Sequence, residues 1–167
     1  MAQLTLSFDF SRCSGCYSCV VACQDQNDFM DDNVALRQVI ANESGQYPFA
    51  VISYVSMSCF HCEDAPCLMA CPTGAIFRIV KNGVVDINRE LCVGCHSCEL
   101  ACPFGSPKFA KDCLMIKCDL CSIRLDHGME PACVRVCPTG ALGFGTLGEI
   151  SELKTKKTSR KILYPFI

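Results

Sequence analysis

Several features that mark common enzyme classes are missing from this chain of 167 residues. It has no tryptophan, no GxGxxG or GxxxxGK[ST] loop, and no evident hydrolytic or nucleophilic constellation. No apolar run approaches the roughly 18 residues of a membrane span. These absences argue against nucleotide chemistry, hydrolysis and a direct membrane span. We therefore expect a protein that is soluble or held by a partner.

Targeting signals and strong net charge are also lacking. The N-terminus MAQLTLSFDF has no basic region, no long apolar stretch and no twin arginine. This predicts a cytoplasmic protein; export beside a partner that carries a twin-arginine signal is the alternative. The formal charge of −2 hides a basic segment at 151–167. Its charge could meet an acidic partner, but nothing else suggests nucleic acid.

Cysteine is abundant, with 17 residues, and two explanations compete. Disulfides are typical of secreted chains and usually of an even count. The odd count and the missing secretory signal favour metal binding instead. A chain this rich in cysteine is held by cross-links or metal more than by a large apolar core.

Sixteen of the cysteines form four groups, and the remaining one, Cys113, is predicted to be a small buried apolar residue. The groups are Cys13, Cys16, Cys19 and Cys23; Cys59, Cys62, Cys67 and Cys71; Cys92, Cys95, Cys98 and Cys102; and Cys118, Cys121, Cys133 and Cys137. Proline follows the last cysteine of every group but the first.

The spacing C-x2-C-x2-C-x3-C indicates iron–sulfur chemistry. Three thiolates so close in sequence can wrap the corners of a small cube, with backbone N–H groups turned toward sulfur. With Cys-Pro at its end, the run is typical of [4Fe–4S] proteins, in which the fourth cysteine serves the other cluster of a pair. Sixteen thiolates predict four [4Fe–4S] clusters. A four-thiolate zinc site in the fourth group, with its eleven-residue gap, is the alternative.

The local pattern predicts short strands and one-turn helices, with no long helix. LTLSFDF (4–10) alternates as a half-buried strand does, 75–80 with 84–87 and 34–42 with 49–57 form hairpins, and LMIK (114–117) is a short strand. Cys98 and Cys102 are i and i+4, so a short helix would present both on one face. Because Gln24 and not proline follows Cys23, that end can continue as helix.

Other side chains are predicted to have supporting roles. His61 and His96 lie inside the cluster loops and are expected near the clusters or at the surface, where hydrogen bonding could tune a potential. His127 is expected in a loop or at a partner contact. Tyr17 and Phe60 are expected to pack and exclude water.

Over about residues 1–150 the chain resembles the four-cluster iron–sulfur subunits of the dimethyl sulfoxide reductase type. The telling pieces are SRCSGCYSCVVAC, SCFHCEDAPCLMACPTGAI, CVGCHSCELACPFGSPKF and KCDLC with PACVRVCPTGAL. The resemblance implies an α+β fold of two ferredoxin-like halves in one domain, 1–150, followed by the basic tail 151–167. It also implies crossed ligation, in four sets: Cys59, Cys62, Cys67 with Cys102; Cys92, Cys95, Cys98 with Cys71; Cys13, Cys16, Cys19 with Cys137; and Cys118, Cys121, Cys133 with Cys23.

The resemblance further implies an electron-transfer subunit without catalysis of its own. Its partner would be a molybdenum- or tungsten-pterin catalytic subunit, with room for a further redox subunit that carries flavin or anchors in a membrane. The chain ends soon after the fourth group, as do small subunits beside tungsten aldehyde oxidoreductases. A freestanding polyferredoxin, or a subunit of a hydrogenase or formate dehydrogenase complex, is the alternative.

Overall fold

The computed structural model describes residues 3–28 and 34–163. Helices and strands are short and alternate along most of the chain. The strands are β1 (Leu4–Phe8), β2 (Gln38–Ser44), β3 (Val51–Met57), β4 (Ile76–Arg78), β5 (Val85–Ile87), β6 (Lys108–Phe109), β7 (Met115–Ile116) and β8 (Leu142–Thr146). The helices are α1 (Ser18–Gln26), α2 (Pro66–Met69), α3 (Ser97–Ala101), α4 (Ser122–Asp126), α5 (Ala132–Arg135) and α6 (Leu147–Leu163), with 3-10 turns η1 (Phe10–Arg12) and η2 (Arg89–Leu91).

Each described strand pairs with one antiparallel neighbour, so the sheets are two-stranded. Three pairs are local: β2 with β3, β4 with β5, and β6 with β7. The fourth joins the ends of the described fold, because β1 pairs with β8 in a register that sets Leu4 opposite Thr146. The α+β class predicted from the sequence is confirmed.

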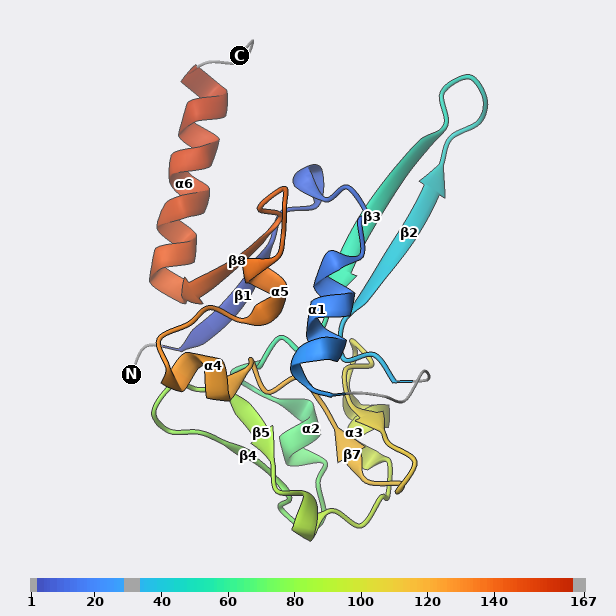
Figure 1. Cartoon of the computed structure of the whole chain (residues 1–167), viewed down its shortest axis with the longest axis vertical. Helices are drawn as coiled ribbons and strands as arrows, with labels where there is room; N and C mark the ends of the chain where they lie inside the picture. Colours follow the sequence, from blue (N-terminus) through green and yellow to red (C-terminus); the bar gives the residue numbers. More distant parts are fainter. Residues whose placement is uncertain (1–2, 29–33, 164–167) are drawn as a thin grey trace.

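The predicted strands and hairpins are found, with shifted ends. The predicted strand 4–10 is β1, and the hairpin of 75–80 with 84–87 is β4–β5. The hairpin of 34–42 with 49–57 is β2–β3, whose first strand starts later and runs further, and β7 lies in LMIK. Helix α1 continues past Cys23 to Gln26, as the missing proline indicated. Figure 1 shows β2–β3 projecting from the body as an arm.

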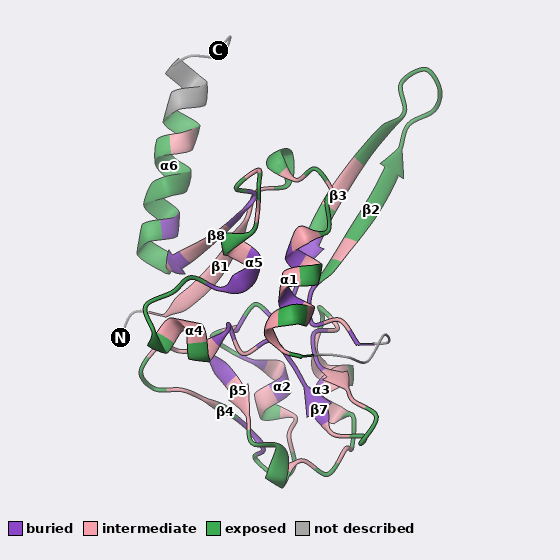
Figure 2. Cartoon of the chain, in the orientation of Figure 1, coloured by how far each residue is buried: buried purple, intermediate pink, exposed green. Residues whose placement is uncertain are grey.

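The prediction of no long helix is wrong, because α6 has 17 residues. Its start is a reciprocal cap. The Glu149 carboxylate accepts from the Thr146 backbone N–H at 2.7 Å, and the Glu149 N–H donates to the Thr146 hydroxyl at 3.3 Å. The sequence T-L-G-E carries this capping-box pattern and could have predicted the helix. Most of α6 is exposed, and it packs near its base against β8 and β1 (Figure 2).

The core consists of small clusters of buried side chains, and cysteines belong to each of them. One joins Cys67 and Cys98 to aliphatic residues of the β4–β5 region, another contains Cys23, and the third contains Cys19 and Cys133. Each of the four cysteine groups thus contributes at least one cysteine to the interior that the short elements enclose. No helix among the described residues is long and apolar enough to cross a membrane.

Candidate iron–sulfur centres

Four helices, α1, α2, α3 and α5, each position two cysteines that are four residues apart in the sequence. Cys19 and Cys23 lie on α1, and Cys98 lies on α3, which Cys102 caps. Cys67 and Cys133 lie on α2 and α5, and each is followed four residues later by another cysteine. α1 packs against α5, and α2 packs against α3. Each packed pair of helices therefore offers cysteines at both ends.

The sixteen grouped cysteines line four separate cavities, each with three cysteines from one group and a fourth from another. Site A is lined by Cys13, Cys16, Cys19 and Cys137; site B by Cys118, Cys121, Cys133 and Cys23; site C by Cys59, Cys62, Cys67 and Cys102; and site D by Cys92, Cys95, Cys98 and Cys71. The structure thus brings together the members of every set that the resemblance implied. All 17 cysteines are free thiols.

The cavities suit a polynuclear group better than one ion. Each is a hollow between four cysteines that is partly open to solvent at its mouth. In the described part of the chain, no three His, Cys, Asp or Glu side chains converge closely enough to hold a single metal ion. A zinc site needs four ligands at about 2.0–2.3 Å from one point. The fourth group therefore gives no local zinc site, and its cysteines divide between sites A and B.

Backbone N–H groups point at several of the thiol sulfurs, as the loop geometry predicted. His61 N–H donates to Cys59 Sγ at 3.4 Å, and Leu120 N–H donates to Cys118 Sγ at 3.4 Å. Cys102 and Cys92 accept from Ser106 and Met115 at 3.5 Å. Such bonds favour the thiolate, the form that ligates metal.

Two buried donors without an acceptor test whether a cluster fits. Among the described residues, the buried side-chain nitrogens without a partner are Arg37 Nε and His61 Nε2. Arg37 lines site B and His61 lines site C. His61 Nδ1 accepts from Val85 N–H at 3.2 Å, so the neutral ring carries its proton on Nε2. A group rich in thiolate and sulfide would supply acceptors for both donors, so these residues fit the predicted clusters.

Burial separates the central sites from the outer ones. All four cysteines of site B are buried, and burial raises the pKa of Cys23 to about 12. Cys16 of site A and Cys95 of site D are exposed, and hydrogen bonds from Ser18 and Ser97 lower their pKa values. The environment therefore favours the thiolate more at these exposed cysteines than at site B, where a compensating cation or metal is needed.

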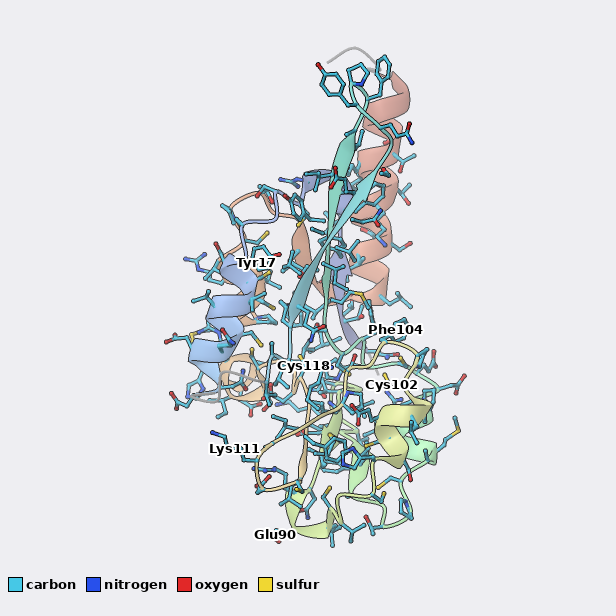
Figure 3. All side chains as sticks on the ribbon, turned by 90° about the vertical axis from the view of Figure 1, so that its right-hand side faces the viewer. Tyr17, Glu90, Cys102, Phe104, Lys111 and Cys118 are labelled. Carbon is cyan, nitrogen blue, oxygen red and sulfur yellow. The ribbon has the colours of Figure 1, made fainter. Side chains whose placement is uncertain are left out.

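Electrostatic effects between cysteines of different sites indicate the order of the sites. Burial raises the pKa of Cys98 to about 11, and Cys67 of site C adds to the rise. Burial likewise raises the pKa of Cys118 of site B, with a further rise from Cys59 of site C. The pKa of Cys133 is raised by burial and by Cys19 of site A. The sites thus form a row, D–C–B–A. Figure 3 shows Cys118 near the middle of the molecule, where this row passes from one half to the other.

The supporting residues lie partly where expected. His61 is buried at site C, where burial and then Lys117 lower its pKa to about 3. His96 lies at site D and stacks on Phe109 with ring centroids 3.7 Å apart. Tyr17 lines site A and Phe60 lines site C, as packing residues would, although both keep some exposure.

Two other predicted residues differ in outcome, and two residues near the sites were not predicted. His127 lies exposed at the end of α4, in the predicted loop region. Cys113 was predicted to be buried and is exposed, because it lies in the tight turn between β6 and β7, where its φ is 61°. Arg37 and Lys117, which are buried beside the sites, were missed. Lys117, between Ile116 and Cys118, is a charge inside an apolar run, and this pattern could have indicated its burial.

Comparison with known proteins matches the chain to the 4Fe-4S dicluster domain over residues 50–147, and to a second family of the same description over residues 12–75. The B subunit of the anaerobic dimethyl sulfoxide reductase of Haemophilus influenzae is 37% identical, over 99% of this chain and 83% of its own length. The protein belongs to the 4Fe-4S dicluster iron–sulfur subunits. Its cofactors are four [4Fe–4S] clusters, and it is an electron-transfer protein, not a catalyst.

Two further relatives are named as electron-transfer or iron–sulfur subunits of redox enzymes. The thiosulfate reductase electron transfer subunit PhsB of Salmonella typhi is 40% identical over 91% of this chain and 80% of its own length. The iron–sulfur subunit of the nitrate-inducible formate dehydrogenase of Escherichia coli is 36% identical over 95% of this chain. The match spans 60% of that longer relative. This iron–sulfur subunit thus shares its dicluster plan with components of several reductases and a dehydrogenase.

Proposed function

We propose that this iron–sulfur subunit relays electrons to or from a catalytic subunit that carries molybdenum- or tungsten-pterin. The observation that carries the proposal is the single row of four cysteine-lined cavities, with an exposed cysteine at each end, Cys16 and Cys95. A row that reaches the surface at both ends suits a path between two redox partners. No substrate pocket is required for that role.

In this proposal the sixteen cysteines of sites A to D hold the clusters in the crossed sets described above. When bound, the clusters supply one-electron storage and transfer. The chain contributes spacing through its paired helices, N–H donors to sulfur, and buried cations. Helix α3, which contains Cys98 and is capped by Cys102, joins sites D and C, and α1 joins sites A and B through Cys19 and Cys23.

The relatives favour one class of catalytic partner. Their names are those of dimethyl sulfoxide reductase, thiosulfate reductase and formate dehydrogenase subunits. The tungsten aldehyde oxidoreductase type, which the sequence suggested as one possibility, has no support among these relatives. The alternative of a freestanding polyferredoxin is an outcome of the test below. A cytoplasmic location stays a prediction, with export beside a twin-arginine-bearing partner as its alternative.

The test is metal analysis of the protein isolated anaerobically from its native host with whatever stays bound. About 16 irons per chain, from four clusters of four, with molybdenum or tungsten in a co-purifying subunit, is the expected result. Full iron in a protein that purifies alone and reduces unrelated enzymes would favour the free carrier. Zinc in place of iron would overturn the proposal.

The basic segment 151–167 is proposed to grip an acidic surface of the partner. Lys154 and Lys156 are exposed on α6, whereas Lys157 forms an ion pair with Asp9. Removing 151–167 should leave the visible absorbance of the clusters unchanged and weaken complex formation. The double replacement K154Q with K156Q removes charge and keeps the helix. It therefore distinguishes an effect of lost positive charge from an effect of losing the segment itself. Unchanged assembly in both variants would remove the tail from the proposal.

A further inference from the structure

Arg37 is a buried cation that forms no ion pair with any carboxylate of the described residues. Its side chain is 2% exposed. Burying a charge without a counter-charge is costly, and arginine does not lose its proton to avoid the cost. Anionic thiolates at site B, which Arg37 lines, would supply a counter-charge to this guanidinium. Asp119 also lines site B, but its carboxylate accepts from Cys121 N–H and from Ser122.

The three nitrogens of the guanidinium have different surroundings. Nη1 donates to Ser56 Oγ at 2.9 Å, and Nη2 donates to Ser58 Oγ at 2.7 Å. Nε has no partner, and the side chain lines site B. Burial raises the pKa of the Cys133 thiol, and the Arg37 charge and a hydrogen bond from the Arg37 side chain lower it. Arg37 thus interacts directly with a thiol of site B.

Ser56 extends the contact to site A. Its Oγ lies 3.5 Å from Cys19 Sγ. Because arginine can only donate, Ser56 Oγ is the acceptor in its bond to Nη1, and its own hydrogen remains for the cysteine sulfur. Two consecutive hydrogen bonds therefore connect Arg37, through the Ser56 hydroxyl, to Cys19 of site A. Ser56 also lines site A together with Val39.

We propose that Arg37 is a positioning residue that serves as the shared counter-charge of sites A and B, and that it raises the reduction potentials of both bound clusters. Reduction adds negative charge to a cluster, and a fixed cation nearby stabilises the reduced form more than the oxidised form. The hydrogen bond through Ser56 acts in the same direction at Cys19, because bonds to ligand sulfur favour added charge. The inference rests on the cysteine sets proposed above.

The experiment is a potentiometric titration, followed by electron paramagnetic resonance, of the full chain loaded with its clusters. The variant R37M removes the charge and keeps a side chain of similar length. We expect two of the four reduction steps to move to lower potential. Each should change the ratio of reduced to oxidised cluster at least tenfold, which for one electron is about 59 mV. Four unmoved steps at full iron content would overturn the inference.

Two further variants make the test specific. R135M removes an exposed arginine on α5, two residues from Cys133, and should move no step. S56A keeps the buried charge but removes the hydroxyl that faces Cys19, so one step alone should fall. A shift in R135M as large as that in R37M would point to net charge and overturn the inference.

Folding failure does not leave the question open. If R37M loses iron, R37K takes its place, since it keeps the charge and loses the planar fork. We then expect R37K to retain its iron. Its reduction potential at site B should differ from the wild-type value by less than the site A potential of S56A does. If every reduction potential of S56A were then equal to the wild-type value, the inference would be overturned. Wild-type protein without about 16 irons, four per cluster, would instead contradict the proposed function.

Discussion

The two halves of the molecule follow one plan with different surroundings. The inner half is the middle of the sequence, residues 58–117, and contains sites C and D. The outer half comes from the two ends of the described sequence, residues 3–28 with 118–146, and contains sites A and B. In each half a strand leads into a 3-10 turn capped by an Asp or Asn side chain, Asp9 or Asn88. A residue with φ of 61°, Tyr17 or His96, then precedes the helix. The cysteine loops are therefore the same local structure used twice.

What packs on those loops differs between the halves. The inner half is nearly continuous in sequence, and a turn through Cys113 closes against one of its cysteine loops. The outer half joins the two ends of the described fold and is covered by residues at the start and end of the β2–β3 arm, including Arg37 and Ser56. The difference shows that the cysteine spacing sets the loop, whereas segments outside the motif set its burial and charge.

The largest expected effect is that of removing iron. Cysteines belong to every core cluster, so chelation should abolish most of the folded structure, as in other small metal-dependent domains. Because β1–β8 closes the longest loop, its amide protection should disappear before that of β4–β5. Circular dichroism and hydrogen exchange measure both effects, with reconstitution by iron and sulfide as the control. Equal protection in iron-free and loaded protein would contradict the prediction.

The next effect concerns crossed ligation in the inner half. C102S should perturb the cluster at site C, although Cys102 belongs in sequence to the group that supplies site D. C98S, at the other end of the same short helix, is the matched control and should perturb site D. Iron content, with a loss of up to about four irons, and electron paramagnetic resonance of each cluster measure the outcome. A change at site D alone in C102S would show local ligation.

A smaller effect distinguishes equivalent glycines of the two halves. An alanine Cβ at Gly94 would lie 2.6 Å from the Cys113 carbonyl oxygen, and one at Gly15 would lie 2.5 Å from the Tyr54 ring. Both positions have positive φ, which costs roughly 1–2 kcal/mol for a residue with a side chain. A ring can turn away and a backbone carbonyl cannot, so G94A should lower the denaturation midpoint more than G15A. Anaerobic denaturant titrations measure this, and equal midpoints would contradict it.

The smallest effect is expected for the side chain of Cys113. Its thiol is exposed and lines none of the four sites, so C113S should change stability by no more than about 0.5 kcal/mol. Iron content should stay at the wild-type value. A loss of iron in C113S, beside an intact G94A, would show that the thiol matters and the backbone contact does not.

The sequence predicted the local structure well where a short pattern determines it. Cysteine spacing predicted the loops, alternation predicted β1, and the missing proline after Cys23 predicted a longer α1. The long helix α6 was missed, although the capping box at Thr146 is evident in the sequence. The pairing of β1 with β8 was not predictable from either strand, because both are short and nothing within them specifies a partner so distant in sequence.

The cysteine spacing was enough to predict the number and kind of cofactors, because sixteen thiolates at these intervals suit four iron–sulfur cubes. The environment of each cavity, in contrast, depends on how distant segments pack around it. Arg37 looks like an ordinary surface residue in the sequence, and Cys113 looks like a core residue. Their burial or exposure depends on segments that meet only when distant parts of the sequence close the fold, and burial decides how strongly a charge acts on a nearby cluster.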